Sequence, residues 1–239
     1  MVPGERRRGC PQIAWHRLHE KVGDYRHGSS SVENGASWFQ RNWEPSIACA
    51  DERRLGTWGD GGKWICDPAC MLAAGRCVVY SVGGNNEWSF EVSMVKRGCE
   101  VHTFDHTVAA PRTPPGVVFH RWGLGVNADA QPMRSLDSIM AELNHTRVDV
   151  FKMDIEGGEF RVLADQATVK TMHSKVTQMQ IEFHYRMGVL QPGHNFATRM
   201  ESVAEALDNS GFRVFGKEPN IEYSDGSCVE YAFINTYLI

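Results

Sequence analysis

Long apolar runs are missing from this sequence of 239 residues. No stretch approaches the roughly 20 apolar residues of a transmembrane helix, and the N-terminus lacks the apolar segment of a signal peptide. We therefore expect a soluble chain with no membrane segment, cytoplasmic as it is written. A removed signal-anchor would leave this same sequence behind, so the lumen of the secretory pathway stays open as an alternative.

A strong excess of charge is missing as well. The formal net charge is -4, and the one basic run, Arg6-Arg7-Arg8, is short and terminal. Domains that bind nucleic acid through general electrostatic attraction carry a clear positive excess. We therefore expect no nucleic-acid partner, and nothing in the composition indicates an oligomeric state.

Paired zinc-ligand motifs are also missing. Among the seven cysteines, Cys66 and Cys70 are four positions apart with Cys77 nearby, but no C-x-x-C pair accompanies them. A disulfide among Cys49, Cys66, Cys70 and Cys77 is the better interpretation if the protein matures in an oxidising lumen. The N-glycosylation triplet that begins at Asn144 fits that compartment.

Residues 77–105 are predicted to form a strand, a glycine turn, a helix and a second strand. The apolar run 78–82 stops at Gly83 and Gly84, apolar residues then recur at helical spacing, and an extended pattern ends on Asp105. Glycines at such a turn let the backbone approach a ligand, and an acid about 20 positions later can bind ribose hydroxyls. The sequence thus predicts an adenosine-type cofactor held by Gly83, Gly84, Asn85 and Asp105.

The third glycine of a dinucleotide loop is absent, because Trp88 occupies its position. A bulky indole there argues against a bound pyrophosphate, so an NAD-dependent oxidoreductase is the weaker alternative. S-adenosylmethionine has a ribose and an adenine but no phosphate, and it needs only the bend and the acid. We assign to the same site Asp60, His106 directly after Asp105, and Trp122-Gly123 at the end of a third predicted strand.

The glycine-rich stretch 54–64, which contains Asp60, has two interpretations. Its glycine content favours a turn between two packed segments. Its position just before the cofactor strand favours a lid or a wall of the substrate site.

A second group of ionisable residues follows two later strands, predicted at 148–154 and 176–184. Asp154 and Glu156 share one face if the extended conformation persists to Glu156, and Glu182 and His184 share one face of the next strand. Ligands of open α/β sheets bind beyond the carboxyl ends of the strands, so we expect these four side chains to converge beside the cofactor. The competing interpretation is that some acids, Glu159 above all, cap the following helix.

The rest of the chain divides into two parts. Residues 1–36 are predicted to be an N-terminal arm or linker, and residues 37–239 the main domain. The aromatic segment 38–45 is expected to pack on the core, and Ser135 is expected to cap a helix. The last two strands, 212–216 and 228–238, follow each other without a helix and are predicted to pair antiparallel.

Several motifs resemble those of known methyltransferases. KMDIEGGEF, SLDSIM and QIEFHY are similar to motifs of the FkbM-type family, and NWEPSIAC, GDGGKWICDP and VVYSVGGNNEWSFE to the related methyltransferase-like domains, together covering about residues 38–238. The resemblance implies an α/β class I methyltransferase fold: a Rossmann-like, seven-stranded, mostly parallel sheet with helices on both faces and an antiparallel last strand. It also implies S-adenosyl-L-methionine as cofactor.

One position departs from the family pattern. Many class I methyltransferases carry Asp or Glu two residues before the first glycine, where this chain has Ser81. Contacts to the methionine part of the cofactor are then expected from Asp60, Asn85 or the backbone. Ser81 also prompts the main alternative function, a module that binds S-adenosylmethionine without turnover.

The resemblance implies O-methylation of a hydroxyl on a sugar, glycan or small molecule. Such a hydroxyl needs a base, and the ordinary pKa of His184 suits that role, with Asp154 and Glu156 completing the catalytic set. Alternatively, Asp154, Glu182 and His184 hold Mg²⁺ or Mn²⁺, an arrangement that resembles the metal site of catechol-type O-methyltransferases.

Overall fold

The structure is a computed structural model that describes residues 39, 42–49, 51–66, 77–109, 111–126, 132–184, 196–222 and 228–239. The predicted arm at 1–36 and Cys70 lie outside the described residues. Within the described ranges, no helix combines the length and the apolar character needed to span a membrane.

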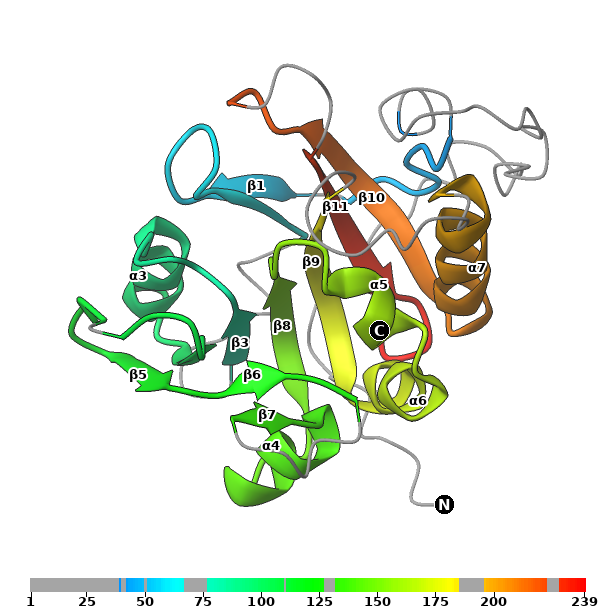
Figure 1. The fold of residues 1–239 in the computed structure, drawn as a ribbon. Helices are drawn as coiled ribbons and strands as arrows, with labels where there is room; N and C mark the ends of the chain where they lie inside the picture. The colour runs from blue at the N-terminus through cyan, green and yellow to red at the C-terminus, as the bar shows by residue number, and fades with distance from the viewer. Residues whose placement is uncertain are drawn as a thin grey trace.

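The described residues form strands and helices that are interspersed along the chain (Figure 1). The strands are β1 (Glu52–Leu55), β2 (Lys63–Cys66), β3 (Val78–Val82), β4 (Glu100–Phe104), β5 (Val117–His120), β6 (Gly123–Leu124), β7 (Met133–Arg134), β8 (Val148–Met153), β9 (Val176–His184), β10 (Phe212–Pro219) and β11 (Cys228–Asn235). The helices are α3 (Ser89–Lys96), α4 (Leu136–Glu142), α5 (Glu159–Leu163), α6 (Gln166–Lys175) and α7 (Phe196–Asn209).

The main sheet has seven strands in the order β10-β11-β9-β8-β3-β4-β5. The strands from β9 to β5 are parallel neighbours, whereas β11 runs antiparallel to both β9 and β10. β11 is reversed because it follows β10 directly, without the helix that a parallel crossover requires. This is the class I methyltransferase fold predicted from the sequence, with its antiparallel last strand.

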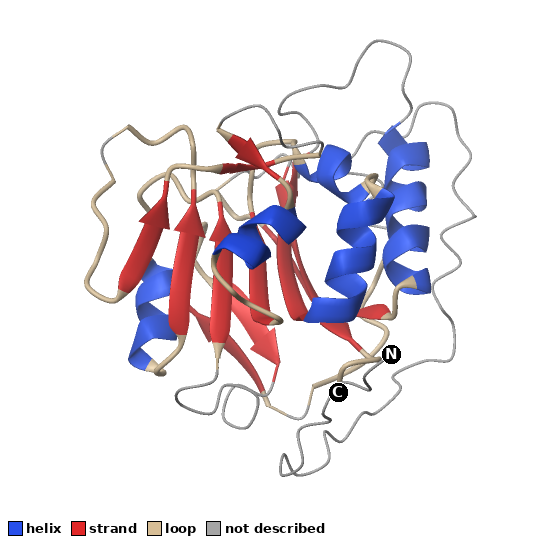
Figure 2. Cartoon of the chain, turned by 90° about the horizontal axis from the view of Figure 1, so that it is seen from below, coloured by secondary structure: helices blue, strands red, loops and turns tan. Residues whose placement is uncertain are grey.

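Helices cover both faces of this sheet (Figure 2). One core joins side chains of α4, α5, α6 and α7 to one face, with Phe151 and Phe183 fully buried in it. The other core joins α3 to the opposite face, where Phe90 and Met94 pack with Val79. Because both faces are covered, the central strands β8 and β9 are buried at nearly every position, and the polar side chains that they carry are buried with them.

The antiparallel hairpin β1–β2 lies over the second face of the sheet. Gln178 on β9 accepts a hydrogen bond from Cys66 N at 2.8 Å and donates one to Cys66 O at 3.0 Å, so the hairpin is hydrogen-bonded to the sheet. The glycine-rich stretch 56–62 is the connection between its two strands. The polar residues of β9 on this face are therefore buried beneath the hairpin, including Gln178, Glu182 and His184.

Most predicted elements are confirmed, with differences at their ends. Ser135 caps α4 by accepting a hydrogen bond from Ser138 N at 3.2 Å. Trp43 packs on the core against Phe183 and Tyr231. The strand β8 ends at Met153, so the expectation that the extended conformation persists to Glu156 is wrong: Glu156 has a φ of 55°, in the left-handed region.

Candidate active site

The glycine bend after β3 lies directly against the end of β8. Gly83 has a φ of 77°, and a Cβ added to it would lie 1.6 Å from the carbonyl oxygen of Asp154. The amide of Asp154 donates a hydrogen bond to Val82 O at 2.9 Å. Gly83 is thus required by contact with the protein backbone, and this contact joins the predicted cofactor loop to the predicted catalytic acid.

Gly84 is different, since a Cβ there would meet nothing closer than Glu87 O at 3.7 Å. Asp105 lies at the same loop, where its Oδ2 faces Asn85 N at 3.4 Å. Its Oδ1 accepts hydrogen bonds from Thr107 N and Thr107 Oγ1 at 2.8 and 2.6 Å. The carboxylate is thereby oriented by Thr107, and Oδ2 retains the capacity to accept hydrogen bonds from a ribose.

The remaining predicted cofactor residues gather after β4 and β5. A Cβ on Gly123 would lie 2.7 Å from Nδ1 of His106, so these two residues are in contact. Trp122 is stacked on His120 with ring centroids 4.5 Å apart, and the Arg134 guanidinium lies 3.9 Å from the centroid of the Trp122 ring. Trp122 therefore has a fixed orientation at the end of β5.

The four predicted ionisable residues meet where β8 and β9 end. His184 Nε2 lies 3.7 Å from Asp154 Oδ1 and 3.5 Å from Glu156 Oε2. Asp154 also forms a close group with Asp60 and Glu182, whose carboxylate oxygens lie within 4.8 Å of one another. Asp60 comes from the hairpin loop, which therefore forms a wall of this site as well as a turn between two strands.

Two buried lysines supply positive charge that the sequence analysis did not assign. Lys63, 2% exposed, pairs with Glu230 and donates a hydrogen bond to Asp60 O at 3.0 Å. Lys152 donates to Gly83 O at 3.0 Å and lies 3.8 Å from Asp154 Oδ2. In the sequence, Lys152 lies two residues before Asp154 and Lys63 lies three residues after Asp60. These positions did not identify the partner of either lysine.

His184 is held as a cation by its neighbours. Its burial favours the neutral ring, but hydrogen bonds with Cys228 and Glu159 and the negative charge of Glu159 outweigh it and raise the pKa of His184 to about 12. Glu159 is fully buried, and its Oε1 accepts from His184 Nδ1 at 3.1 Å and from Ile155 N at 2.9 Å. The argument for His184 as general base assumed an ordinary pKa, and that assumption is wrong for this site.

Glu182 and Asp154, two acids of the cluster, have pKa values shifted in opposite directions. Burial raises the pKa of Glu182 to about 9, helped by the charges of Glu230 and Asp154, so Glu182 holds its proton near neutral pH. Burial opposes the ionisation of Asp154, but the charges of Lys152, Lys63 and His184 outweigh it and lower its pKa. Asp154 is therefore the ionised carboxylate at the centre of the cluster.

The predicted metal site of Asp154, Glu182 and His184 fits a cation poorly. Among the described residues, these three do not form one close group of their own: Asp154 groups with Glu156 and His184 or with Asp60 and Glu182, and Glu182 groups with His184 and Cys228. The raised pKa values of Glu182 and His184 mean that a cation at this site would have to displace a proton from each of them. The buried ammonium of Lys63 already supplies a positive charge beside Asp154 and Glu182.

Ser81, which occupies the position where the family pattern has an acid, has a hydrogen-bond partner that the sequence did not reveal. Ser81 is fully buried, and its hydroxyl donates a hydrogen bond to Glu91 Oε1 at 2.5 Å. Glu91 comes from the first turn of α3, and its Oε2 is buried without a partner among the described residues. A carboxylate from the helix thus lies next to the position where many class I methyltransferases carry one on the strand.

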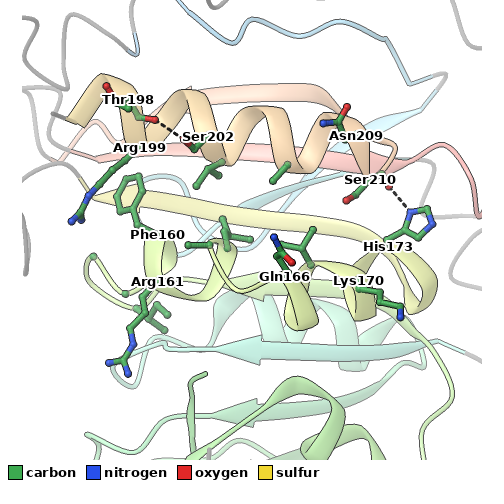
Figure 3. Close-up of a pocket in the computed structure, with 18 of the residues that line it drawn as sticks. Phe160, Arg161, Gln166, Lys170, His173, Thr198, Arg199, Ser202, Asn209 and Ser210 are labelled. Atoms are coloured by element: carbon green, nitrogen blue, oxygen red, sulfur yellow. Dashed lines mark hydrogen bonds between the residues drawn. The ribbon is translucent and has the colours of Figure 1, made fainter. Parts of the chain in front are cut away.

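A cavity of about 1160 Å³ opens between α5, α6 and α7 (Figure 3). Apolar side chains such as Phe160 and Val203 line it together with the basic residues Arg161, Lys170 and Arg199. Glu156 also lines it and so belongs to both the cavity and the ionisable cluster. The cavity therefore extends away from the cluster on the face of the sheet that α5, α6 and α7 cover.

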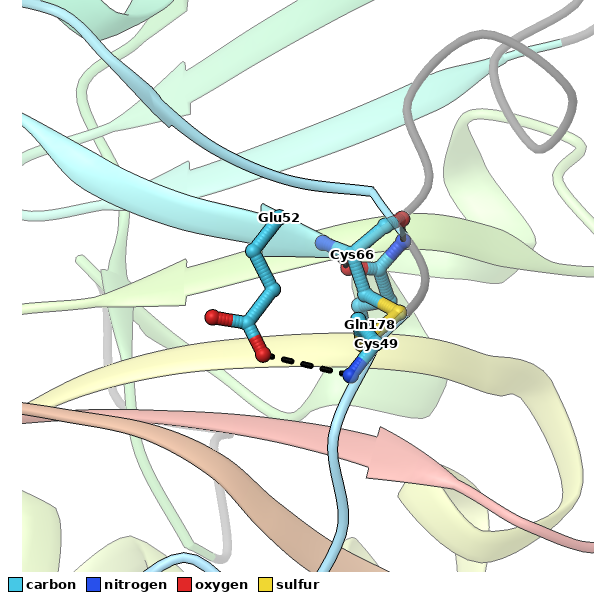
Figure 4. Close-up of a disulfide and its surroundings, with 4 residues drawn as sticks. All are labelled: Cys49, Glu52, Cys66 and Gln178. Atoms are coloured by element: carbon cyan, nitrogen blue, oxygen red, sulfur yellow. Dashed lines mark hydrogen bonds between the residues drawn. A yellow bond between two sulfur atoms is a disulfide. The ribbon is translucent and has the colours of Figure 1, made fainter. Parts of the chain in front are cut away.

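Among the described residues, two disulfides join segments of the domain that are distant in sequence. Cys49 is bonded to Cys66 of β2 (Figure 4), and Cys77 before β3 is bonded to Cys99 before β4. The predicted disulfide among Cys49, Cys66, Cys70 and Cys77 is confirmed for Cys49 and Cys66, whereas Cys77 pairs with Cys99, which lies outside that set. The zinc alternative for Cys66 and Cys77 is wrong, because both sulfurs are in disulfides.

Comparisons with known proteins identify a matching family model and two curated relatives. A family model described as "Methyltransferase domain" matches residues 9–235. Two curated relatives are each named "Probable methyltransferase-like protein 24". The Rattus norvegicus protein is 25% identical, over 95% of this chain and 63% of its own length. The Homo sapiens protein is 27% identical, over 67% of this chain and 50% of its own length. The chain thus spans less than two thirds of either relative.

Solved structures with some likeness to the chain include a fibrillarin pre-rRNA processing protein from Methanococcus jannaschii. It is 14% identical, with a TM-score of 0.44, over 79% of this chain and 88% of its own. A 16S rRNA (adenine(1408)-N(1))-methyltransferase from Catenulisporales acidiphilia is 14% identical, with a TM-score of 0.42, over 77% of this chain and 98% of its own.

Proposed function

Because the chain belongs to the methyltransferase-domain family, we propose that it transfers a methyl group from S-adenosylmethionine to a hydroxyl of a sugar or other small molecule. One observation carries the proposal: Gly83 and the Asp154 carbonyl are in contact, so the cofactor loop and the ionised acid form one site. The resemblance of KMDIEGGEF and QIEFHY to FkbM-type motifs supports an oxygen acceptor.

The cofactor residues fit a nucleoside. Asp105 offers Oδ2 to the ribose hydroxyls, and a Cβ on Gly84 would make only ordinary contacts, with Glu87 O at 3.7 Å and Lys152 Nζ at 3.9 Å. Asn85 and Asn86, with φ of 43° and 65°, keep the loop backbone in the left-handed region where it turns away from the sheet. When bound, S-adenosylmethionine supplies a methyl group on a positively charged sulfur. Trp88 stands at the position of the third glycine of a dinucleotide loop, and its indole packs against Phe119.

Asp154 is the group that we assign to proton removal. Its carboxylate is ionised and its side chain is 16% exposed, so an acceptor hydroxyl can reach it. Proton removal by a positioned base contributes on the order of 10²–10⁴-fold to a rate. The imidazolium of His184 positions Asp154 and Glu156, and Glu159 in turn fixes the ring of His184.

Among the proposed catalytic residues, Glu156 is the one that we place nearest to the methyl acceptor. Its side chain is 61% exposed, and it lines the cavity between α5 and α7. We propose that the acceptor occupies this end of the cavity and presents its hydroxyl to Asp154. Holding two reactants in a productive orientation can supply about 7–11 kcal/mol of the barrier, which is the main task of such a site.

The two disulfides support a proposal about compartment. Disulfides persist in oxidising environments such as the secretory lumen. Asn144, the first residue of the glycosylation triplet, is exposed and turns through a φ of 57°. We propose that the domain works in that lumen, where glycans are available as acceptors. Secretory expression followed by treatment with an N-glycosidase should lower the apparent mass, and Asn144→Gln should abolish this change.

Calorimetry with S-adenosylmethionine, its demethylated product and NAD tests the cofactor. We expect the first two to bind and NAD not to bind. Transfer of isotope-labelled methyl to free sugars and protein glycans then tests the reaction. Asp154→Asn should reduce transfer at least about 100-fold while cofactor affinity is retained, and Asp137→Asn on the exposed face of α4 is the matched control. Binding without transfer to any hydroxyl would favour the module without turnover.

A further inference from the structure

A second cluster of ionisable residues lies at the opposite end of β4 from the cofactor loop. Glu100 is the first residue of β4, His102 is two positions further along, and His145 lies in the connection that leads into β8. Asp105 follows the other end of the strand. At about 3.3 Å per residue, the strand separates Glu100 from Asp105 by roughly 16 Å. The cluster is therefore independent of the proposed active site.

The three side chains converge on one point. Glu100 Oε1 lies 2.8 Å from His102 Nε2 and 3.3 Å from His145 Nε2, and the three residues offer one ligand atom each within 4.8 Å of one another. Zinc ligands at about 2.0–2.2 Å in tetrahedral geometry lie about 3.3–3.5 Å apart. The distance from Glu100 to His145 already has this value. The distance from Glu100 to His102 needs to widen by about half an ångström, which the mobile end of an exposed glutamate permits.

Both imidazole rings are oriented by hydrogen bonds at their other nitrogen. Nδ1 of His102 lies 2.9 Å from Nε2 of His120, and Nδ1 of His145 lies 2.8 Å from the hydroxyl of Tyr80. Metal-binding histidines generally donate this second N–H to a neighbouring acceptor, which leaves the lone pair of the first nitrogen for the metal. His120 and Tyr80 can each accept such a hydrogen bond, so both rings can present Nε2 as a ligand.

The cluster is open to solvent on the side of Glu100. His102 is buried, whereas the Glu100 side chain is 56% exposed, which gives an ion a path from solvent.

We propose that Glu100, His102 and His145 bind a zinc ion, with water at the fourth position. Two imidazoles and one carboxylate are a ligand set that suits zinc better than the oxygen-binding cations magnesium and calcium. The ion holds the connection before β8 against the first residue of β4, next to the disulfide at Cys99. Its role in this placement is structural, because the cluster lies remote from the cofactor loop.

Zinc content of the full chain, purified with its disulfides intact, tests the proposal. After chelation and buffer exchange, titration with Zn²⁺ alone should show one bound equivalent. At 100-fold excess over its dissociation constant, zinc should raise the melting temperature by about 5–10 °C. Cobalt(II) in place of zinc should give visible absorption bands that report the coordination.

Variants locate the ion. Glu100→Gln and His145→Gln should each weaken binding by roughly 100-fold or more and abolish the cobalt bands, with the fold checked by circular dichroism. His173→Gln on α6, a histidine outside the cluster, is the matched control and should bind one equivalent. Failure to bind zinc, or loss of binding in Asp154→Asn with retention in Glu100→Gln, would overturn the proposal. Neither outcome bears on the methyltransferase proposal, which calorimetry with S-adenosylmethionine tests separately.

Discussion

Gly83 and Asp154 are in backbone contact, with the Asp154 carbonyl oxygen in the space where a side chain at position 83 would begin. This contact joins the end of β3 to the end of β8, two parallel neighbours in the sheet. Lys152 strengthens it by donating a hydrogen bond to Gly83 O at 3.0 Å. The geometry of the proposed active site depends on this contact, and the first prediction tests it.

Gly83→Ala should destabilise the fold, by roughly 2–5 kcal/mol, because the new methyl group would overlap the Asp154 carbonyl and φ is 77°. Gly84→Ala is the matched control, since its methyl group would meet nothing closer than 3.7 Å. It should keep the fold and lower the affinity for S-adenosylmethionine. Equal destabilisation of the two variants in urea would show that the contact does not have the importance that we assign to it.

Asp105→Asn should weaken binding of S-adenosylmethionine. A hydrogen bond to a charged group contributes about 1.5–3 kcal/mol, which corresponds to roughly a 10- to 150-fold change in affinity. Calorimetry measures the change, with Asp137→Asn as the control. An unchanged dissociation constant for Asp105→Asn would place the ribose elsewhere.

Stability should fall as pH rises above about 5, because Glu182 has a pKa of about 9 in the folded chain against 4.5 as its ordinary value. The folded state keeps a proton that the unfolded state loses, so the free energy of unfolding decreases, by at most about 1.4 kcal/mol per pH unit. Glu182→Gln should flatten this fall.

The informative window for Glu182 is pH 5 to 6.5. Below pH 6.5 His184 is protonated in both states. Above it, the pKa of about 12 for folded His184 adds a second fall of the same sign, which ends only as pH passes 12. Urea unfolding at several pH values gives both slopes. The same slope in wild type and Glu182→Gln between pH 5 and 6.5 would contradict the raised pKa of Glu182.

Removal of the Cys49–Cys66 disulfide should lower stability by about 3 kcal/mol, given the 17 residues that separate the two cysteines. The double variant Cys49→Ser, Cys66→Ser compared with wild type under non-reducing conditions measures this loss. Mass spectrometry of an unreduced digest should also show linked peptides for both disulfides. Alkylation of Cys77 and Cys99 in the native, unreduced protein would contradict the second one.

Methyl transfer should survive chelation of divalent cations, because the buried ammonium of Lys63 already lies among the carboxylates of the site. Chelation would also remove the proposed zinc ion and so destabilise the fold. Activity is therefore measured with and without chelator at low temperature, where the protein stays folded without zinc. Restoration of a lost activity by Mg²⁺ or Mn²⁺, and not by Zn²⁺, would instead support the catechol-type metal site.

The sequence alone determined the fold class and the places where the site would form. The glycine turn at Gly83, the acid at Asp105 and the strand ending near Asp154 were all predicted, because hydrophobic periodicity and turn residues act locally along the chain. The parallel order of the strands then requires their carboxyl ends to meet at one edge, which brought Asp154 and His184 together as expected.

Only the tertiary structure decided the protonation of the site and its hidden partners. The pKa of His184 depends on Glu159 and Cys228, the charge beside Asp154 depends on Lys63 from a hairpin far away in sequence, and Ser81 finds its carboxylate on Glu91. Cys77 likewise forms its disulfide with Cys99 because the two residues directly precede β3 and β4, which are neighbours in the sheet. Electrostatic and covalent partners are set by distances in space, and periodicity along a chain contains no information about those distances.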